Sequence, residues 1–145
     1  MDVFIFFTAW IVATSVMTLF SELWSLISGN EFREPVLLAH LFTKGTIENL
    51  TLGQWVMGLG IHFLFGLFFM LGYEVLWYLT GLMRSAKWSM VFGIVIGLIG
   101  ILGWVIMFRL LTKPSQLNTR HYYVHLLFAH IVFSLGSYMM YEFAA

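Results

Sequence analysis

The chain has 145 residues and a formal net charge of zero, with 61% hydrophobic and only 10% charged residues. Such a composition excludes an ordinary soluble domain, which needs a charged surface, and the balanced charge gives no argument for a nucleic-acid partner. The sequence contains no cysteine, so it offers no disulfide, iron–sulfur ligand or thiolate nucleophile. The composition predicts an integral membrane protein.

Long apolar runs occupy residues 3–27, 55–79, 88–111 and 122–143. Each run reaches the roughly 20 residues with which an α-helix crosses the hydrocarbon core. A membrane β-barrel needs segments of about 10 residues that alternate in polarity, and these runs do not alternate. We therefore expect an all-α fold, an integral membrane four-helix bundle forming a single domain over residues 1–145.

An even number of crossings places both termini on one membrane face, together with the short segment 80–87. The longer segments 28–54 and 112–121 lie on the other face, which we call the loop face. Five Lys and Arg residues lie in or beside the loop face, against two on the terminal face. Basic residues favour cytoplasmic loops, so the loop face is predicted to be cytoplasmic and both termini to lie outside.

The first loop predicts a short helix at about residues 35–43. Glu34 and Pro35 are typical of a helix start, apolar residues follow as far as Phe42, and Gly45 ends the helix. A helix of this length cannot span the bilayer, so it should lie at the interface or fold back over the mouth of the bundle. Glu34 counts among the acidic residues of this loop.

Small residues at helical spacing predict close helix packing. In the second long helix two glycines flank His62 at steps of four, which leaves room for a neighbouring helix or a flat ligand. The third long helix carries a ridge of glycines on one face, as membrane helices do where they approach closely. The helix-packing candidates are Gly58, Gly66, Gly93, Gly97 and Gly100.

Ionisable residues inside membrane helices are costly and are therefore candidates for function. Glu22, His62 and His130 each lie about 8–12 Å from the loop-face end of their helix, at 1.5 Å per residue. We expect these three side chains to converge on one enclosed site, covered in part by the short helix at 35–43.

Further polar residues surround the expected site. Thr18 precedes Glu22 by one helical turn, and Ser134 follows His130 by one turn. Arg109, near the loop-face end of the third long helix, is within reach of Glu22 or of an anionic group. His121 and His125 share a one-turn spacing, but at the helix entrance we interpret them as headgroup or solvent contacts.

The expected site is compatible with four roles. Its side chains can simply hydrogen-bond to one another and hold the helices together. His62 and His130 can ligate one haem iron. With Glu22 they match the donors of a divalent metal such as zinc or non-haem iron. A buried glutamate beside histidines also suits a proton path or small-solute path.

Short motifs in three helices resemble small four-helix bacterial membrane proteins of unknown function. The resemblance implies a four-helix fold and a bacterial origin, hence an inner-membrane location, and it implies no activity. It is carried by residues 12–18, residues 53–55 with His62 and Gly66, and Ala129–His130 with Phe133 and Tyr138.

Nucleophile motifs, phosphate-binding glycine loops and metalloprotease signatures are absent from the sequence, which favours a non-enzymatic protein. We expect an accessory protein or small subunit that contacts membrane lipids and other membrane subunits or a second copy of itself, and no nucleic acid. A haem- or metal-binding redox subunit using His62 and His130, and a transporter or proton path, remain the alternatives.

The charge asymmetry predicts the orientation of the loops. Because the chain has no cysteine, single cysteines at Ser28, Ser85 and Ser115 can be labelled by an impermeant reagent added to intact cells. We expect labelling at Ser85 and protection at Ser28 and Ser115. Labelling at Ser115 with protection at Ser85 would invert the predicted topology.

Overall fold

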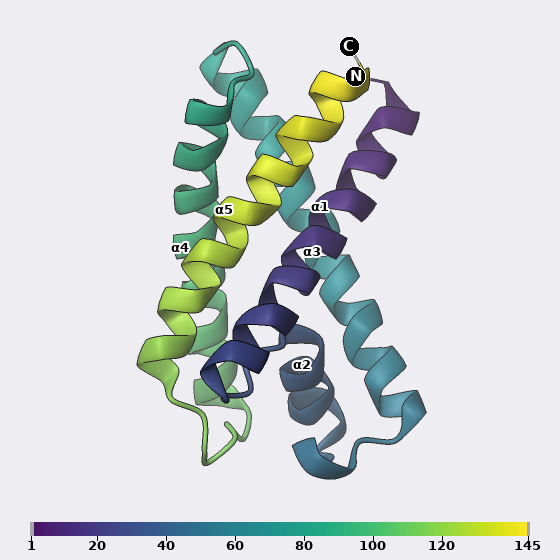
Figure 1. The fold of residues 1–145 in the computed structure, drawn as a ribbon, viewed down its shortest axis with the longest axis vertical. Helices are drawn as coiled ribbons and strands as arrows, with labels where there is room; N and C mark the ends of the chain where they lie inside the picture. Colours follow the sequence, from purple (N-terminus) through teal and green to yellow (C-terminus); the bar gives the residue numbers. More distant parts are fainter. Residues whose placement is uncertain (1, 145) are drawn as a thin grey trace.

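The structure, a computed structural model, describes residues 2–144, and all of its regular elements are helices (Figure 1). Four helices are long and apolar enough to cross a membrane, which confirms the predicted four-helix bundle. The spanning helices are α1 (Val3–Ser28), α3 (Leu52–Thr80), α4 (Ala86–Leu110) and α5 (Thr119–Ala144). Two short elements join α1 to α3, namely α2 (Glu34–Thr43) and the 3-10 turn η1 (Ile47–Asn49).

Polar caps extend several helices slightly beyond the apolar runs. At the start of α3 the Thr51 hydroxyl accepts a hydrogen bond from the backbone of Gln54, whose side chain accepts one from the backbone of Thr51. This reciprocal pair satisfies two backbone N–H groups at a helix start. At the other end, α1 and α3 stop at Gly29 and Gly81, whose φ angles of 67° and 60° suit glycine.

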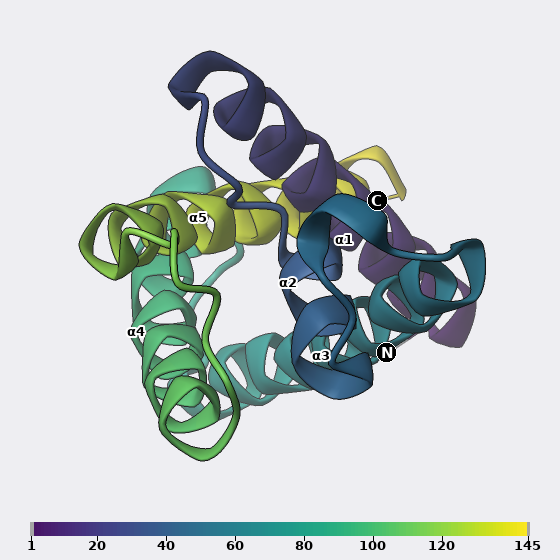
Figure 2. The same ribbon diagram turned by 90° about the horizontal axis from the view of Figure 1, so that it is seen from below.

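Helix α5 packs along both α1 and α4, and both termini lie at the same end of the bundle (Figure 1). Helix α3 packs chiefly against α2 and makes fewer contacts with α1 and α4. Seen from the loop face, α2 lies within the ring of long helices, beside α3 (Figure 2). The short helix therefore completes the bundle at the loop face.

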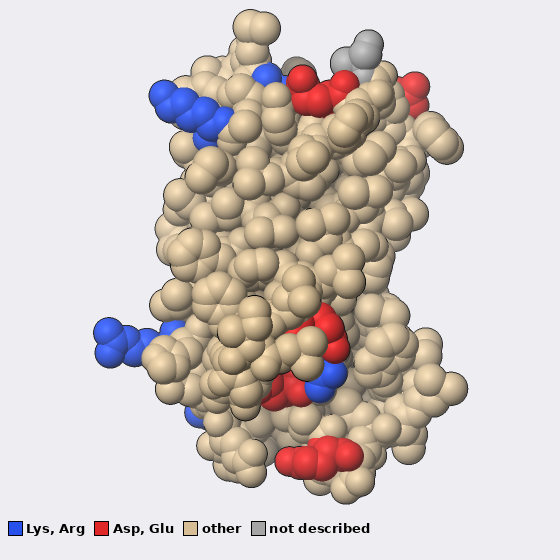
Figure 3. Space-filling view, in the orientation of Figure 1, with Lys and Arg blue, Asp and Glu red and all other residues tan. Residues whose placement is uncertain are grey.

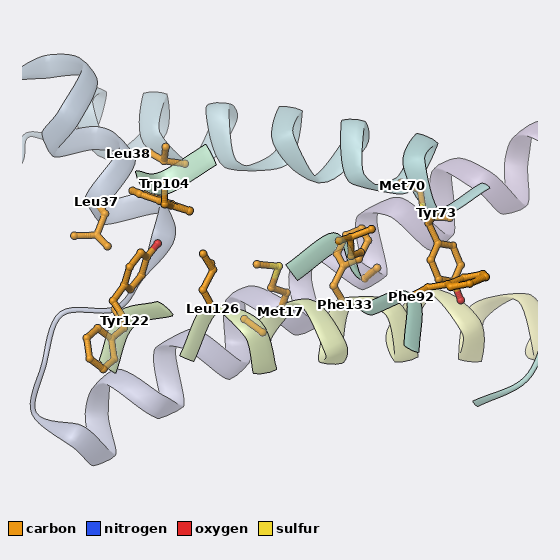
Figure 4. Packing of buried hydrophobic residues seen from close by; sticks show 14 of the residues in the cluster. Met17, Leu37, Leu38, Met70, Tyr73, Phe92, Trp104, Tyr122, Leu126 and Phe133 are labelled. Atoms are coloured by element: carbon orange, nitrogen blue, oxygen red, sulfur yellow. The ribbon is translucent and has the colours of Figure 1, made fainter. Parts of the chain in front are cut away.

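Of the two positions expected for the short helix, the structure has it folded back into the mouth of the bundle. Seven of the ten residues of α2 are buried. Leu37 and Leu38 face Trp104 and Tyr122 at one end of a continuous core, and Tyr73 and Phe92 lie at the other end (Figure 4). A non-spanning helix at this depth is stable only because protein surrounds it.

Glycine allows the closest approaches between helices. A Cβ atom at Gly58 would overlap the carbonyl oxygen of Pro35 and would lie 2.7 Å from Cβ of Ala39, so α2 rests directly on the backbone of α3. On α4, Gly93, Gly97 and Gly100 all face α5. The glycine ridge of the third long helix is thus used within the chain.

On the face seen in Figure 3, charged side chains lie at the terminal end and in the lower half toward the loop face, with an uncharged belt between them. At the terminal face Arg84 pairs with Glu74 at 2.7 Å, and its guanidinium carbon lies 3.7 Å from the ring centroid of Tyr141. The belt is what a lipid-facing surface requires.

The close α4–α5 contact predicts that adding a methyl group lowers the stability of the chain at Gly93 but not at Gly103. In Gly93→Ala the new Cβ would lie 2.7 Å from the Cα atom of Ile131, a backbone atom that cannot turn aside. We expect destabilisation of about 1–3 kcal/mol, typical of overpacking, measured by denaturant or thermal unfolding in detergent. Gly103→Ala is the control, because nothing lies within 4 Å of its Cβ position. Equal stability of the two variants would contradict the packing.

Candidate functional site

A small internal cavity of about 30 Å³ lies between α1, α2, α3, α4 and α5. Its walls are mainly aromatic and aliphatic, and its polar lining side chains are Thr14, Glu34, His62 and His130. A cavity needs at least about 10–15 Å³ to admit one water molecule. The space therefore suits a ligand of the size of one or two waters.

His62 joins α3 to α1 through Thr18. Its Nε2 lies 3.0 Å from Oγ1 of Thr18, whose hydroxyl donates to the carbonyl of Thr14 at 2.7 Å. When that hydroxyl proton goes to the Thr14 carbonyl, Nε2 of His62 is the donor in the His62–Thr18 bond. In this arrangement neutral His62 carries its proton on Nε2, and its Nδ1 is a hydrogen-bond acceptor.

His130 has the opposite tautomer. Its Nδ1 lies 2.8 Å from the carbonyl oxygen of Leu126, which can only accept, so Nδ1 carries the proton. Nε2 is buried and has no hydrogen-bond partner among residues 2–144. Gly100 makes room for this ring, since a Cβ there would lie 2.7 Å from Cε1 of His130.

Glu34 brings a carboxyl group into the cluster from the first turn of α2. Its side chain is 2% exposed, and neither of its oxygens has a hydrogen-bond partner in the described part of the chain. Burial raises the pKa of Glu34 to about 8, from an ordinary value of 4.5; the nearby Ser21 hydroxyl opposes this rise, and Glu31 adds to it. The group is therefore poised to hold a proton near neutral pH.

His125 lies next to Glu34 and is fully buried among aromatic rings. Its Nδ1 is 3.8 Å from Oε1 of Glu34, longer than a hydrogen bond. Its ring is stacked with Phe20 at 5.7 Å and with Phe32 at 5.4 Å between centroids. The imidazole is therefore enclosed between two aromatic rings.

The structure corrects the expected role of Glu22. This side chain is 46% exposed and pairs with Arg33 at 3.3 Å instead of joining His62 and His130. The reason is that Met17 and Ser21 form the buried face of α1 at this level, and Glu22 lies on a different side of the helix. The expectation that Glu22, His62 and His130 meet in one cluster is therefore wrong, and Glu34 occupies the place expected of Glu22.

Two other expected members also lie outside the cavity. Arg109 is exposed and does not pair with Glu22. Ser134 is buried one turn beyond His130, where its carbonyl oxygen accepts a hydrogen bond from the Tyr73 hydroxyl at 3.3 Å. Thr18, by contrast, does contact the cluster through His62.

The interpretation of the second histidine pair is half right. His121 is exposed as expected, whereas His125 is fully buried. The sequence reasoning also missed Glu34, which was counted as a loop charge. A usable signal existed, because residues 36–39 and 41–42 make α2 apolar on all sides, and a helix without a polar face is buried.

Neither haem nor a metal ion coordinated by three or more side chains fits the cluster. Pockets for drug-sized ligands, which are smaller than haem, measure roughly 300–1,000 Å³, against about 30 Å³ here. Gly58 and Gly66 do not leave room for a flat ligand, because they face α2 and the side chain of Thr14. Among residues 2–144 no group of three or more metal-ligating side chains is close enough to hold an ion.

No family model matches the chain, and no curated protein or solved structure matches it significantly.

The buried Glu34 carboxyl predicts a stability that falls as pH rises. Between pH 4.5 and about 8 the folded chain retains a proton that the unfolded chain has released. The contribution of Glu34 to the free energy of unfolding, measured as the difference between the wild type and Glu34→Gln, should therefore decrease across this window, with a slope approaching about 1.4 kcal/mol per pH unit. Below the window the group imposes no penalty, and above it the full penalty of a buried carboxylate is present.

Unfolding in detergent across this window tests the assignment. Glu34→Gln should flatten the pH profile and stabilise the chain relative to the wild type on the alkaline side. Glu22→Gln is the matched control and should retain the slope, because Glu22 is half exposed and paired with Arg33. The same slope in the wild type and in Glu34→Gln would assign the pH dependence to another group.

Proposed function

We propose that this chain is a non-enzymatic, multi-pass protein of a bacterial inner membrane whose interior cluster binds and releases protons on a path through the bundle. The observation that carries the proposal is the Glu34 carboxyl, which is buried without a hydrogen bond and lies 3.8 Å from the imidazole of His125. A merely structural acid would have its oxygens satisfied, because each unpaired buried polar group costs about 1–3 kcal/mol.

The neighbouring histidines supply further proton positions. Neutral His130 presents an unpartnered Nε2, and neutral His62 presents an acceptor at Nδ1. A neutral imidazole can accept a proton at one ring nitrogen while it donates one from the other. A relay from Glu34 to these two rings would need water to enter between them.

Buried polar groups continue toward the terminal face. Tyr73 hydrogen-bonds to the hydroxyl of Ser89 at 2.8 Å, and the Glu74–Arg84 pair lies beyond it at the membrane surface. Phe133 lies between Met17 and Tyr73 in the core (Figure 4). This ring separates the two polar regions, so the proposed path is interrupted in this conformation and needs side-chain motion or entering water to conduct.

An accessory-subunit role is the second candidate. Its support is a lipid-facing groove of about 330 Å³ between α1 and α5, lined only by apolar residues such as Val16, Val132 and Met139. Apolar concave surfaces with a small residue, here Gly136, suit packing against a partner helix. In either role we propose that the loop face is cytoplasmic and both termini lie outside.

Proton flux into liposomes distinguishes the two candidates. Purified protein is reconstituted with an internal pH dye, and a potassium diffusion potential drives protons inward. We expect flux above that of empty liposomes for the wild type and for Glu22→Gln, and flux at the empty-liposome level for Glu34→Gln. Wild-type protein without flux would reject the path and favour the accessory role.

A further inference from the structure

We propose that the loop-face ends of α4 and α5 form a binding surface for the headgroup of an anionic phospholipid, centred on Arg109, Tyr123 and Arg120. Binding there requires neither the internal cluster nor proton flux. Three features support this surface: the distribution of charge over the loop face, the contact between the two helix ends, and the apolar side chains that lie beside the arginines.

Charge is unevenly distributed over the loop face. Its acidic residues all belong to α1 and to the segment that joins α1 to α3, and they are Glu22, Glu31, Glu34 and Glu48. Between Glu74 and Glu142 the sequence has no acidic residue at all. Arg109 and Arg120 are exposed and have no acidic partner among residues 2–144. In Figure 3 basic side chains project at the left edge of the lower half, on the side of α4 and α5.

An aromatic contact holds the loop-face ends of α4 and α5 side by side. The ring of Phe108 on α4 lies 6.0 Å from the ring of Tyr122 on α5, measured between centroids. Arg109 and Tyr123 are the next residues on the two helices, and Arg109 is close enough for its charge to act on the Tyr123 hydroxyl. Arg120 precedes Tyr123 by three residues and therefore shares its side of α5. The two arginines and the phenol thus belong to one surface.

The chemistry of this surface matches a phosphate group. A guanidinium offers two parallel N–H donors to phosphate oxygens, and a phenol hydroxyl offers another donor. Helix α5 has no acidic residue in its first turn, so no carboxylate there offsets the positive end of its helix dipole, next to Arg120. Basic residues between membrane helices at the headgroup level are typical of sites for anionic lipids.

Exposed apolar side chains favour a lipid over a soluble phosphate. Ile106 precedes Arg109 by three residues and is 48% exposed, and Val124 follows Arg120 by four residues and is 49% exposed. These steps keep to one side of each helix and lead from the loop face toward the middle of the bundle. A phospholipid can therefore contact the arginines with its phosphate and these side chains with its acyl chains.

The test measures lipid binding to the intact chain in a neutral detergent. Phosphatidylglycerol is titrated into the micelles, and the rise of the unfolding midpoint with lipid concentration gives an apparent Kd. Phosphatidylcholine with the same acyl chains is the reference lipid, and glycerol 3-phosphate is the reference soluble anion. We expect stabilisation by phosphatidylglycerol alone, and we expect it to weaken as sodium chloride is added.

Variants assign the effect to this surface. Arg109→Gln and Arg120→Gln should each raise the apparent Kd for phosphatidylglycerol about fivefold. Lys44→Gln is the matched control and should bind like the wild type, because Lys44 is exposed on the same membrane face but at the end of α2. Native mass spectrometry, which counts the phosphatidylglycerol molecules that stay bound, makes the same comparison without unfolding the chain.

Three results would overturn the lipid site. Equal weakening in Lys44→Gln and in the arginine variants would show that phosphatidylglycerol responds only to the overall charge of the loop face. Equal stabilisation by phosphatidylcholine would remove the role of the anionic headgroup. Equal stabilisation by glycerol 3-phosphate would replace the lipid with a soluble anion. None of these results bears on proton flux, which is measured separately.

Discussion

The contact between α2 and α3 at Gly58 is the constraint on which the interior of this protein depends. Any side chain at that position would meet the Pro35 carbonyl and Ala39 and would push α2 away from α3. With α2 in place, Leu37 and Leu38 complete the core and Glu34 is carried beneath the loop face toward His125. The close approach of α2 that buries Glu34 therefore depends on the absence of a Cβ atom at Gly58.

Much of the fold follows from the sequence because lipid and helix geometry act locally. The length and polarity of each apolar run determine a spanning helix, and glycines spaced along α4 identify the face that packs on α5. Capping residues such as Thr51 and Ser85 explain why helices begin before their apolar runs. None of these inferences requires knowledge of how distant segments meet.

The site could be predicted only in part, because helical phase is hidden in a membrane. On α1 the buried Met17 and the exposed Leu19 are both apolar, so polarity does not distinguish the core face from the lipid face. Glu22 and Thr18 were consequently assigned to one buried stripe, although only Thr18 contacts the cluster. His62 and His130 were identified correctly as cavity residues because depth depends only on helix length. The burial of Glu34 depends on the insertion of α2, a long-range event that no local pattern specifies.

Because Glu34 sits on the re-entrant helix itself, its charge and the position of α2 are coupled. An uncompensated carboxylate in the present geometry is unfavourable, since burial raises its pKa to about 8 and its oxygens have no partner among residues 2–144. Three events relieve this penalty: protonation of Glu34, pairing with a cation, or withdrawal of α2 toward the loop face. The first two keep the bundle closed, and the third opens it. The protonation state of Glu34 is therefore coupled to the stability of α2 in the mouth of the bundle.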